Sequence, residues 1–172
     1  MIHPTIYDNI KVVLEGEVYD LDLAGKIKIV HREDMMDLAS LSRLYRIEFM
    51  IEGKEEQSAM IELVVTAEDL SKEILELEEV EQLGCTLIIY FSTPVADIAK
   101  ECQEIEKTLT ELWEHRPVIK QKITSVFSSE KSALIQPKNE ISLHFGRKIN
   151  EDNIADIENL VEYTYLSLLQ LL

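Results

Sequence analysis

Four consecutive residues, His31-Arg32-Glu33-Asp34, bring a histidine, a base and two acids together. Carboxylate oxygens bind Mg²⁺ or Mn²⁺, and a metal held by them could activate water for the hydrolysis of a phosphoester. One hypothesis is therefore a metal-dependent hydrolase whose ligands are the acids between residues 31 and 62, namely Glu33, Asp34, Asp37, Glu48 and Glu62.

Local structure offers a different explanation of the same stretch, and we favour it. In a strand over 26–32, alternation places His31 on the face of Ile27 and Ile29 and turns Arg32 to the other face. The two basic side chains then diverge. Because the chain contains 33 acidic residues, carboxylates also gather within short stretches by chance. We therefore expect neither metal ligands nor catalytic residues here.

Asp34 is expected to begin a short helix. An aspartate at the N-cap accepts a hydrogen bond from the backbone of the first turn. Asp37 would then be an acid in that first turn, where the helix dipole favours negative charge. The apolar residues that indicate the helical spacing are Met35, Leu38 and Leu41.

Sequence motifs for cofactors and catalysis are absent from the chain. It contains no P-loop, no GxGxxG, no GxSxG, no HExxH and no Asp-x-Asp-x-Asp-Gly calcium loop. Cys85 and Cys102 stand 17 positions apart without a CxxC pair, which predicts reduced thiols packed in the core. We therefore expect a protein without a cofactor.

Basic residues gather in the second half of this acidic chain. Residues 117–149 hold six lysines and arginines against two glutamates, a local excess of +4. If the strands expected at 118–127 and 140–145 pair, alternation places three basic side chains on one polar face. We expect these three to bind an acidic partner protein or a small anionic ligand: Lys120, Lys122 and His144. The alternative is a solvated face whose lysines pair with acids or protect an edge strand.

The net charge of −16 limits the partners of the whole chain. Such a surface repels a phosphate backbone, so we expect no nucleic acid. The longest apolar runs are far too short to cross a membrane, and the first residues lack the features of a secretory signal. We expect a cytoplasmic protein that binds no membrane.

Hydrophobic periodicity and capping residues predict four longer helices. Gly16 would end the first helix, Thr66 would cap the second, and Thr93 with Pro94 would begin the third. Asn150 would cap the last helix, and the ranges of the first three are 4–15, 67–81 and 94–115.

Period-two alternation predicts the strands. The ranges are a hairpin over 17–32, a second hairpin of 43–52 with 58–66, a buried central strand at 84–92, and strands at 118–127 and 140–145. This order indicates one α+β domain over 1–172, with helices packed on a mainly antiparallel sheet. Residues 84–172 match five of the six elements of a ferredoxin-like unit, so we expect that arrangement there.

The C-terminal helix carries more apolar residues than one buried face requires: Ile154, Ile157, Leu160, Val161, Tyr165, Leu168, Leu169, Leu171 and Leu172. A helix that covers a sheet needs an apolar arc of about 100°, so another helix or another chain must cover the surplus. We expect a homodimer through this helix and the helix at 94–115. These features together predict a small regulatory or binding protein that is not an enzyme.

Overall fold

The computed structural model describes residues 5–76, 83–130 and 133–172. The elements along the chain are α1 (Ile6–Leu23), β1 (Ile27–Asp37), β2 (Ser42–Ile51), β3 (Lys54–Val65), α2 (Ala67–Ile74), β4 (Thr86–Pro94), α3 (Ile98–Leu112), β5 (Val118–Thr124), β6 (Phe127–Ser128), β7 (Ala133–Leu134), β8 (Lys138–His144), the 3₁₀ turn η2 (Glu151–Asn153) and α4 (Ile154–Gln170). None of the described helices is both long and apolar enough to cross a membrane.

Six strands form one sheet in the order β1-β2-β3-β4-β8-β5. Every neighbouring pair is antiparallel, so the predicted α+β class with a mainly antiparallel sheet is confirmed. β4 and β5 run parallel to each other, because both pair antiparallel with β8 between them. Since α3 connects β4 to β5, the split β-α-β part of the expected ferredoxin-like arrangement is present.

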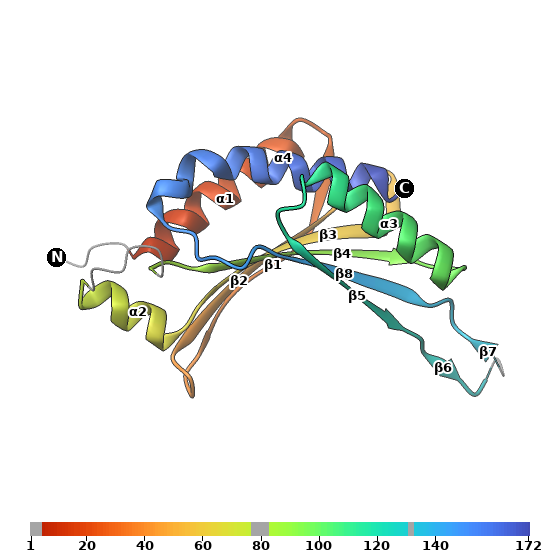
Figure 1. Cartoon of the computed structure of the whole chain (residues 1–172), viewed down its shortest axis with the longest axis horizontal. Helices are drawn as coiled ribbons and strands as arrows, with labels where there is room; N and C mark the ends of the chain where they lie inside the picture. Colours follow the sequence, from red (N-terminus) through yellow and green to blue (C-terminus); the bar gives the residue numbers. More distant parts are fainter. Residues whose placement is uncertain (1–4, 77–82, 131–132) are drawn as a thin grey trace.

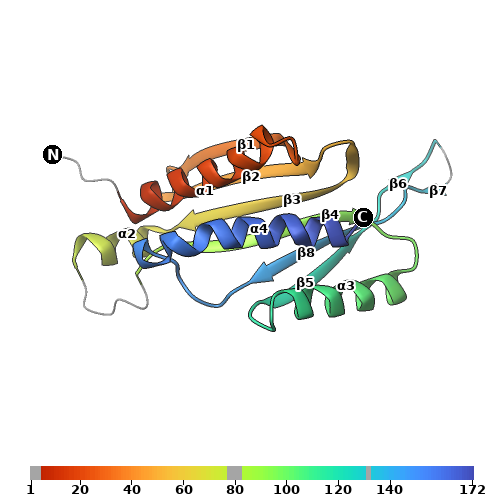
Figure 2. The ribbon, with the colours of Figure 1, turned by 90° about the horizontal axis from the view of Figure 1, so that it is seen from above.

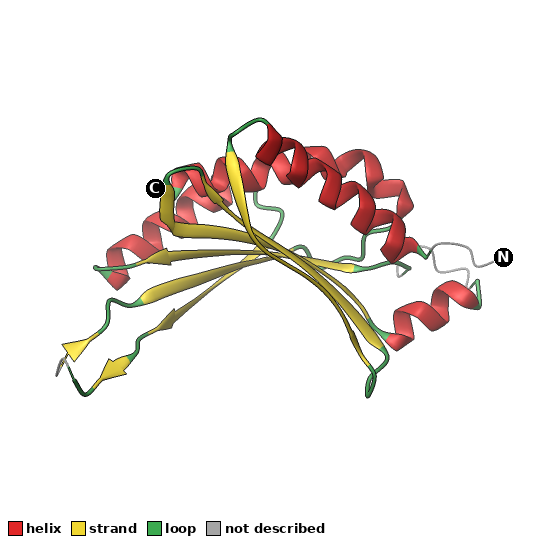
Figure 3. Ribbon diagram, turned by 180° about the vertical axis from the view of Figure 1, so that it is seen from behind, coloured by secondary structure: helices red, strands yellow, loops and turns green. Residues whose placement is uncertain are grey.

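Three helices cover one face of the sheet. Figure 1 shows α1, α4 and α3 above the strands, and in Figure 2 α4 runs between the other two. The strands turn alternate side chains toward these helices, and the largest buried ones include Tyr45, Phe49, Ile61, Ile89 and Phe91. No described helix lies across the opposite face, as Figure 3 also shows. We call this opposite side of the sheet the open face.

The first helix is longer than predicted. It spans Ile6–Leu23 without a break at Gly16, so the range 4–15 was too short and the hairpin over 17–32 is wrong. A glycine inside a helix costs only about 1 kcal/mol, and burial of apolar side chains on both sides of it outweighs that cost. The buried residues keep their helical spacing throughout: Tyr7, Ile10, Leu14, Val18 and Leu21.

A bulge at Val30 changes which side chains of β1 share a face. The pairing of β1 with β2 shifts by one residue between Ile29 and His31. The predicted divergence of His31 and Arg32 is confirmed, because Arg32 donates a hydrogen bond to Tyr19 of α1 at 2.7 Å. However, the inserted residue moves His31 to the open face, away from the side chain of Ile29.

Asp34 lies inside β1, so the prediction that it caps a helix is wrong. It is paired with Tyr45 of β2, and this pairing overrides the helical spacing of the residues that follow it. Its carboxylate accepts hydrogen bonds from the Tyr7 hydroxyl at 3.0 Å and from Lys11 at 2.5 Å. Burial acts to raise the pKa of Asp34, but these bonds hold it below its usual value. Asp37 is the last residue of β1 rather than part of a helix, and its carboxylate accepts a hydrogen bond from the backbone amide of Ala39 in the turn that follows.

The hairpin of 43–52 with 58–66 is confirmed, with a tighter turn than predicted. β3 begins at Lys54, and Gly53 has a φ of 79°, a conformation that glycine adopts without strain. Thr66 caps α2 as expected, through hydrogen bonds that it exchanges with Asp69. The helix ends at Ile74, well before the predicted residue 81, and residues 77–82 lie outside the described part of the chain.

The third helix begins later than predicted. α3 starts at Ile98, and Asp97 caps it by accepting a hydrogen bond from the backbone of Lys100 at 3.1 Å. Thr93 and Pro94 end β4 and pair with the first residues of β8. β4 lies inside the sheet as predicted, but only its alternate side chains are fully buried, because its other side chains lie on the open face.

Asn150 caps the 3₁₀ turn η2, and α4 follows directly from it. Because α4 contacts the sheet, α1 and α3, its wide apolar arc is covered largely within the same chain. Three leucines of its last turns stay partly exposed: Leu166 at 36 %, Leu169 at 36 % and Leu172 at 48 %.

The two cysteines are unpaired. Cys85 is fully buried, and its burial raises the pKa of the thiol to about 12. Cys102 is only half-buried on α3, so the expectation of a core thiol fits Cys85 better than Cys102.

Candidate functional site

Lys120, Lys122 and His144 come together on the open face through the pairing of β5 with β8. Lys120 lies opposite Ser142, and Lys122 lies opposite Glu140. The two strands pair, as the expected polar face required. The role of the three basic residues in binding stays a prediction.

The neighbours of His144 influence whether its ring is protonated. Its Nε2 atom is 2.8 Å from the Ser142 hydroxyl oxygen. Burial, followed by the positive charge of Lys120, lowers the pKa of His144. The neutral ring is therefore favoured, whereas an anion bound beside it would favour the imidazolium.

A cavity of about 890 Å³ opens where β8 ends, and we call it the β8 cavity. Its walls come from α2, from the start of β4 and from residues 144–153. This volume lies in the range of small-molecule sites, roughly 300 to 1,000 Å³. Its basic lining residues are Lys72, His144, Arg147 and Lys148, and its lining also includes one acid, Asp152.

Lys148 holds one wall of the β8 cavity in place. Its ammonium lies 3.0 Å from the Asp69 carboxylate of α2 and donates a hydrogen bond to Thr86 of β4 at 2.9 Å. Burial acts to raise the pKa of Asp69, but hydrogen bonds from Thr66 and Lys148 hold it below its usual value. Lys148 is therefore a structural tie between α2 and the sheet, and its charge is neutralised.

Three other basic residues of this region differ from Lys148. Among the described residues, Lys120, Lys122 and Arg147 form no salt bridge with a carboxylate. Together with His144 they form what we call the cationic cluster, which runs along β5 and β8 to the β8 cavity. This cluster is a local departure from the acidic character of a chain whose net charge is −16.

The acids of the hydrolase hypothesis do not gather into one site. Glu33, Glu48 and Glu62 lie on the open face, whereas Asp34 points toward α1 and Asp37 lies at the end of β1. The Arg46 guanidinium donates to Glu33 at 3.0 Å and to Glu62 at 2.6 Å. No group of three or more potential ligand side chains in the described ranges could hold a metal ion. The geometry therefore gives this hypothesis no support.

Sequence reasoning counted Arg147 and Lys148 within a basic stretch without assigning them to a site. It missed the contribution of α2, which supplies Lys72 to the wall of the β8 cavity. The walls of the β8 cavity come from α2, from the start of β4 and from the segment after β8, which are distant in the sequence. Periodicity within one segment could therefore not show that these residues lie together. The one available signal was the local charge excess.

Comparisons with known proteins found no relative of this chain. No family model matches it, no curated protein matches it, and no solved structure matches it. Its function therefore has to be argued from its own residues.

Proposed function

We propose that this chain is a non-enzymatic cytoplasmic binding protein that takes a small anionic ligand in the β8 cavity. His144 and Arg147 line the cavity and would lie beside the anionic group. Lys120 and Lys122 extend the positive field along β5. The unpaired cysteines agree with a reducing compartment.

One observation carries this proposal: in a strongly acidic protein, Arg147 lines a cavity and Lys120 and Lys122 lie on the neighbouring strand, and none of the three forms a salt bridge with a described carboxylate. These side chains are exposed, and basic groups that gather at a surface attract an opposite charge from solution. The carboxylates of the chain could have neutralised these cations, as Asp69 neutralises Lys148. An anion from solution would supply the missing charge, and the attraction would weaken as salt rises.

Inorganic pyrophosphate is a suitable probe, and the double substitution Lys120→Glu with Lys122→Glu tests the cluster. We expect pyrophosphate to raise the melting temperature of the natural protein, because a ligand bound only by the folded state stabilises by about 2.7 kcal/mol at 100 times its Kd. We expect the double variant to lose this shift. Arg147→Glu should lose it as well, since that side chain lines the cavity itself.

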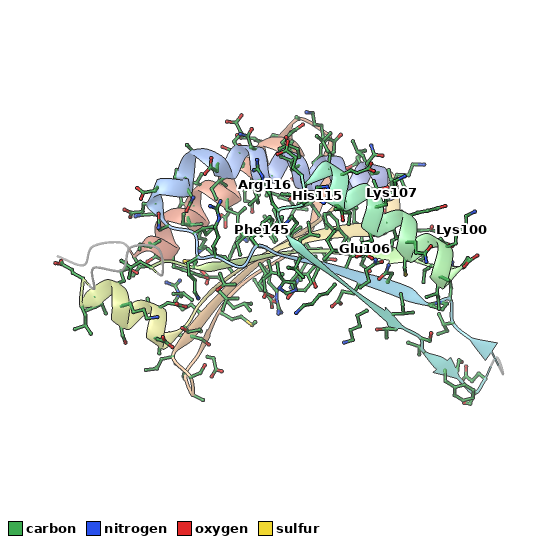
Figure 4. All side chains as sticks on the ribbon, viewed as in Figure 1. Lys100, Glu106, Lys107, His115, Arg116 and Phe145 are labelled. Carbon is green, nitrogen blue, oxygen red and sulfur yellow. The ribbon has the colours of Figure 1, made fainter. Side chains whose placement is uncertain are left out.

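Two lysines of α3 offer a matched control for these charge reversals. Lys100 and Lys107 are exposed on α3, away from the β8 cavity (Figure 4). Reversing both charges changes the net charge of the protein by the same amount as the cluster variant. The control should keep the thermal shift. If pyrophosphate gave no shift with the natural protein, or an equal shift with the cluster variant, the proposal would be wrong.

We also propose that the protein forms a homodimer through the last turns of α4. Because α1 and α3 cover most of the apolar side chains of α4, the homodimer proposal is supported only by the leucines that stay partly exposed. These are Leu166, Leu169 and Leu172. Apolar side chains that lie close together at a surface are typical of a contact between chains. In a two-fold dimer, the same leucines of two copies would meet each other.

Sedimentation of a variant with Leu169→Glu and Leu172→Glu tests the dimer. We expect the natural chain to sediment as a dimer and this variant as a monomer, because charged side chains would face each other across the contact. Truncating the helix after Tyr165 would be a poor test, since it removes the fully buried Leu168. A natural chain that sedimented as a monomer would refute the dimer.

A further inference from the structure

A second cavity, of about 320 Å³, adjoins the first and is mostly apolar; we call it the aromatic cavity. α3, the segment after β8 and α4 all contribute to its wall. Its apolar lining residues include Leu87, Leu112, Trp113, Phe145, Leu160 and Tyr163.

Three aromatic rings form one wall of the aromatic cavity. The centre of the Trp113 ring lies 5.5 Å from that of Phe145 and 5.6 Å from that of Tyr163. The indole nitrogen of Trp113 donates a hydrogen bond to the hydroxyl oxygen of Ser167 at 2.9 Å. This bond and the packing of the rings hold the wall in one arrangement, ready to contact an apolar group.

Arg147 and Phe145 line both cavities, so the two spaces share a wall. Arg116 stands at the rim of the aromatic cavity, and Figure 4 shows it beside the end of α3, above Phe145. Arg116 forms an exposed salt bridge with Glu114, whereas Arg147 forms none with a described carboxylate. A ligand in the aromatic cavity would therefore lie beside a guanidinium without a described salt bridge, although Glu114 and Asp156 also line this cavity.

We infer that the ligand is an amphiphilic anion: an aromatic or other apolar group occupies the aromatic cavity, and an attached anionic group lies against Arg147 in the β8 cavity. This inference rests on the proposed function and names the chemical class of its ligand. A purely polar anion would leave the apolar cavity unfilled, and a neutral ring would leave the cationic cluster uncompensated. Only a molecule with both parts uses both cavities.

The dye 1-anilinonaphthalene-8-sulfonate is a probe with both parts, and N-phenyl-1-naphthylamine has the same rings without the sulfonate. We expect the sulfonate dye to bind at least tenfold more tightly than the neutral dye, as measured by the rise of dye fluorescence. Arg147→Glu should remove this preference. Pyrophosphate should displace the sulfonate dye and leave the neutral dye bound.

Asn159→Phe tests the aromatic cavity. Asn159 lines this cavity from an exposed position on α4, so a larger side chain there fills the space without disturbing the core. We expect this variant to bind the sulfonate dye at least tenfold more weakly and to bind pyrophosphate normally. Glu158→Phe is the matched control, because Glu158 is the exposed neighbour of Asn159 on α4 and does not line the cavity.

Taken together, the outcomes distinguish failure of this inference from failure of the proposed function. Pyrophosphate binding together with equal affinity for the two dyes would overturn the inference and leave the proposed function in place. A sulfonate dye that bound Asn159→Phe as tightly as the control variant would also overturn the inference. Absence of both pyrophosphate and dye binding would overturn the inference and the proposed function together.

Discussion

Gly84→Ala is expected to lower the free energy of unfolding by about 3 kcal/mol, through backbone strain and overpacking. Gly84 has a φ of 130°, which an L side chain rarely adopts. A Cβ atom there would also overlap the carbonyl oxygen of Ile149. That carbonyl cannot easily move, because it accepts a hydrogen bond from the backbone of Cys85 at 2.8 Å. Urea denaturation followed by the fluorescence of Trp113, the only tryptophan, measures the loss.

Gly16→Ala is the matched control for this substitution. Gly16 lies inside α1, and no atom lies within 4 Å of the position that its Cβ would take. The same chemical change should therefore stabilise the protein there, by about 0.5 to 1 kcal/mol. Equal effects at the two positions would contradict the strain that we assign to Gly84.

The Gly84→Ala variant also tests whether the position of the segment after β8 determines the shape of both cavities. Ile149 and Cys85 form an isolated pair of backbone hydrogen bonds that attaches the segment after β8 to the start of β4. Asn150, the next residue, lines the β8 cavity, and Ile149 lines the aromatic cavity. A shift of this segment should therefore weaken pyrophosphate binding as well as stability.

Local signals predicted those elements in which neighbouring residues decide the structure. The hairpin at residues 43–66 follows from alternation around Gly53, and the start of α2 follows from Thr66 with Asp69 three residues later. Alternation within β5 and within β8 also indicated which side chains of each strand share the face of Lys120 and His144. In each case the residues that carry the signal lie within a few positions of one another, whereas the pairing of β5 with β8 joins distant segments.

The wrong predictions share a different cause, which is tertiary packing that overrides a local signal. Gly16 looks like a helix end, but burial against the sheet continues on both sides of it. Thr93 and Pro94 resemble a helix start, yet pairing with β8 keeps them in β4. The bulge at Val30 depends on how β1 meets β2, and a single strand contains no sign of it. The two cavities were out of reach for the same reason, since their walls come from distant segments.

Arg46→Met is expected to lower the free energy of unfolding by about 2 kcal/mol. Arg46 lies between Glu33 and Glu62, directly opposite both in the pairing of β1, β2 and β3. Hydrogen bonds to these carboxylates raise the pKa of the guanidinium, which therefore stays charged. Glu62 is 5 % exposed, so removal of Arg46 leaves a buried carboxylate without its cation. We place the loss below the 3 to 5 kcal/mol typical of fully buried pairs because Arg46 itself is partly exposed.

A double-mutant cycle separates this electrostatic effect from lost packing. Glu62→Gln in the Arg46→Met background removes the unpaired charge, so the two substitutions together should cost less than the sum of each alone, by at least 1 kcal/mol. Arg116→Met is the surface control, since Arg116 and Glu114 are 73 % and 66 % exposed and such pairs contribute about 0.5 kcal/mol or less. Two results would contradict this prediction: additive losses of unfolding free energy in the cycle, or a loss for Arg46→Met no larger than that for Arg116→Met. Either would show that the open face tolerates the unpaired carboxylate of Glu62.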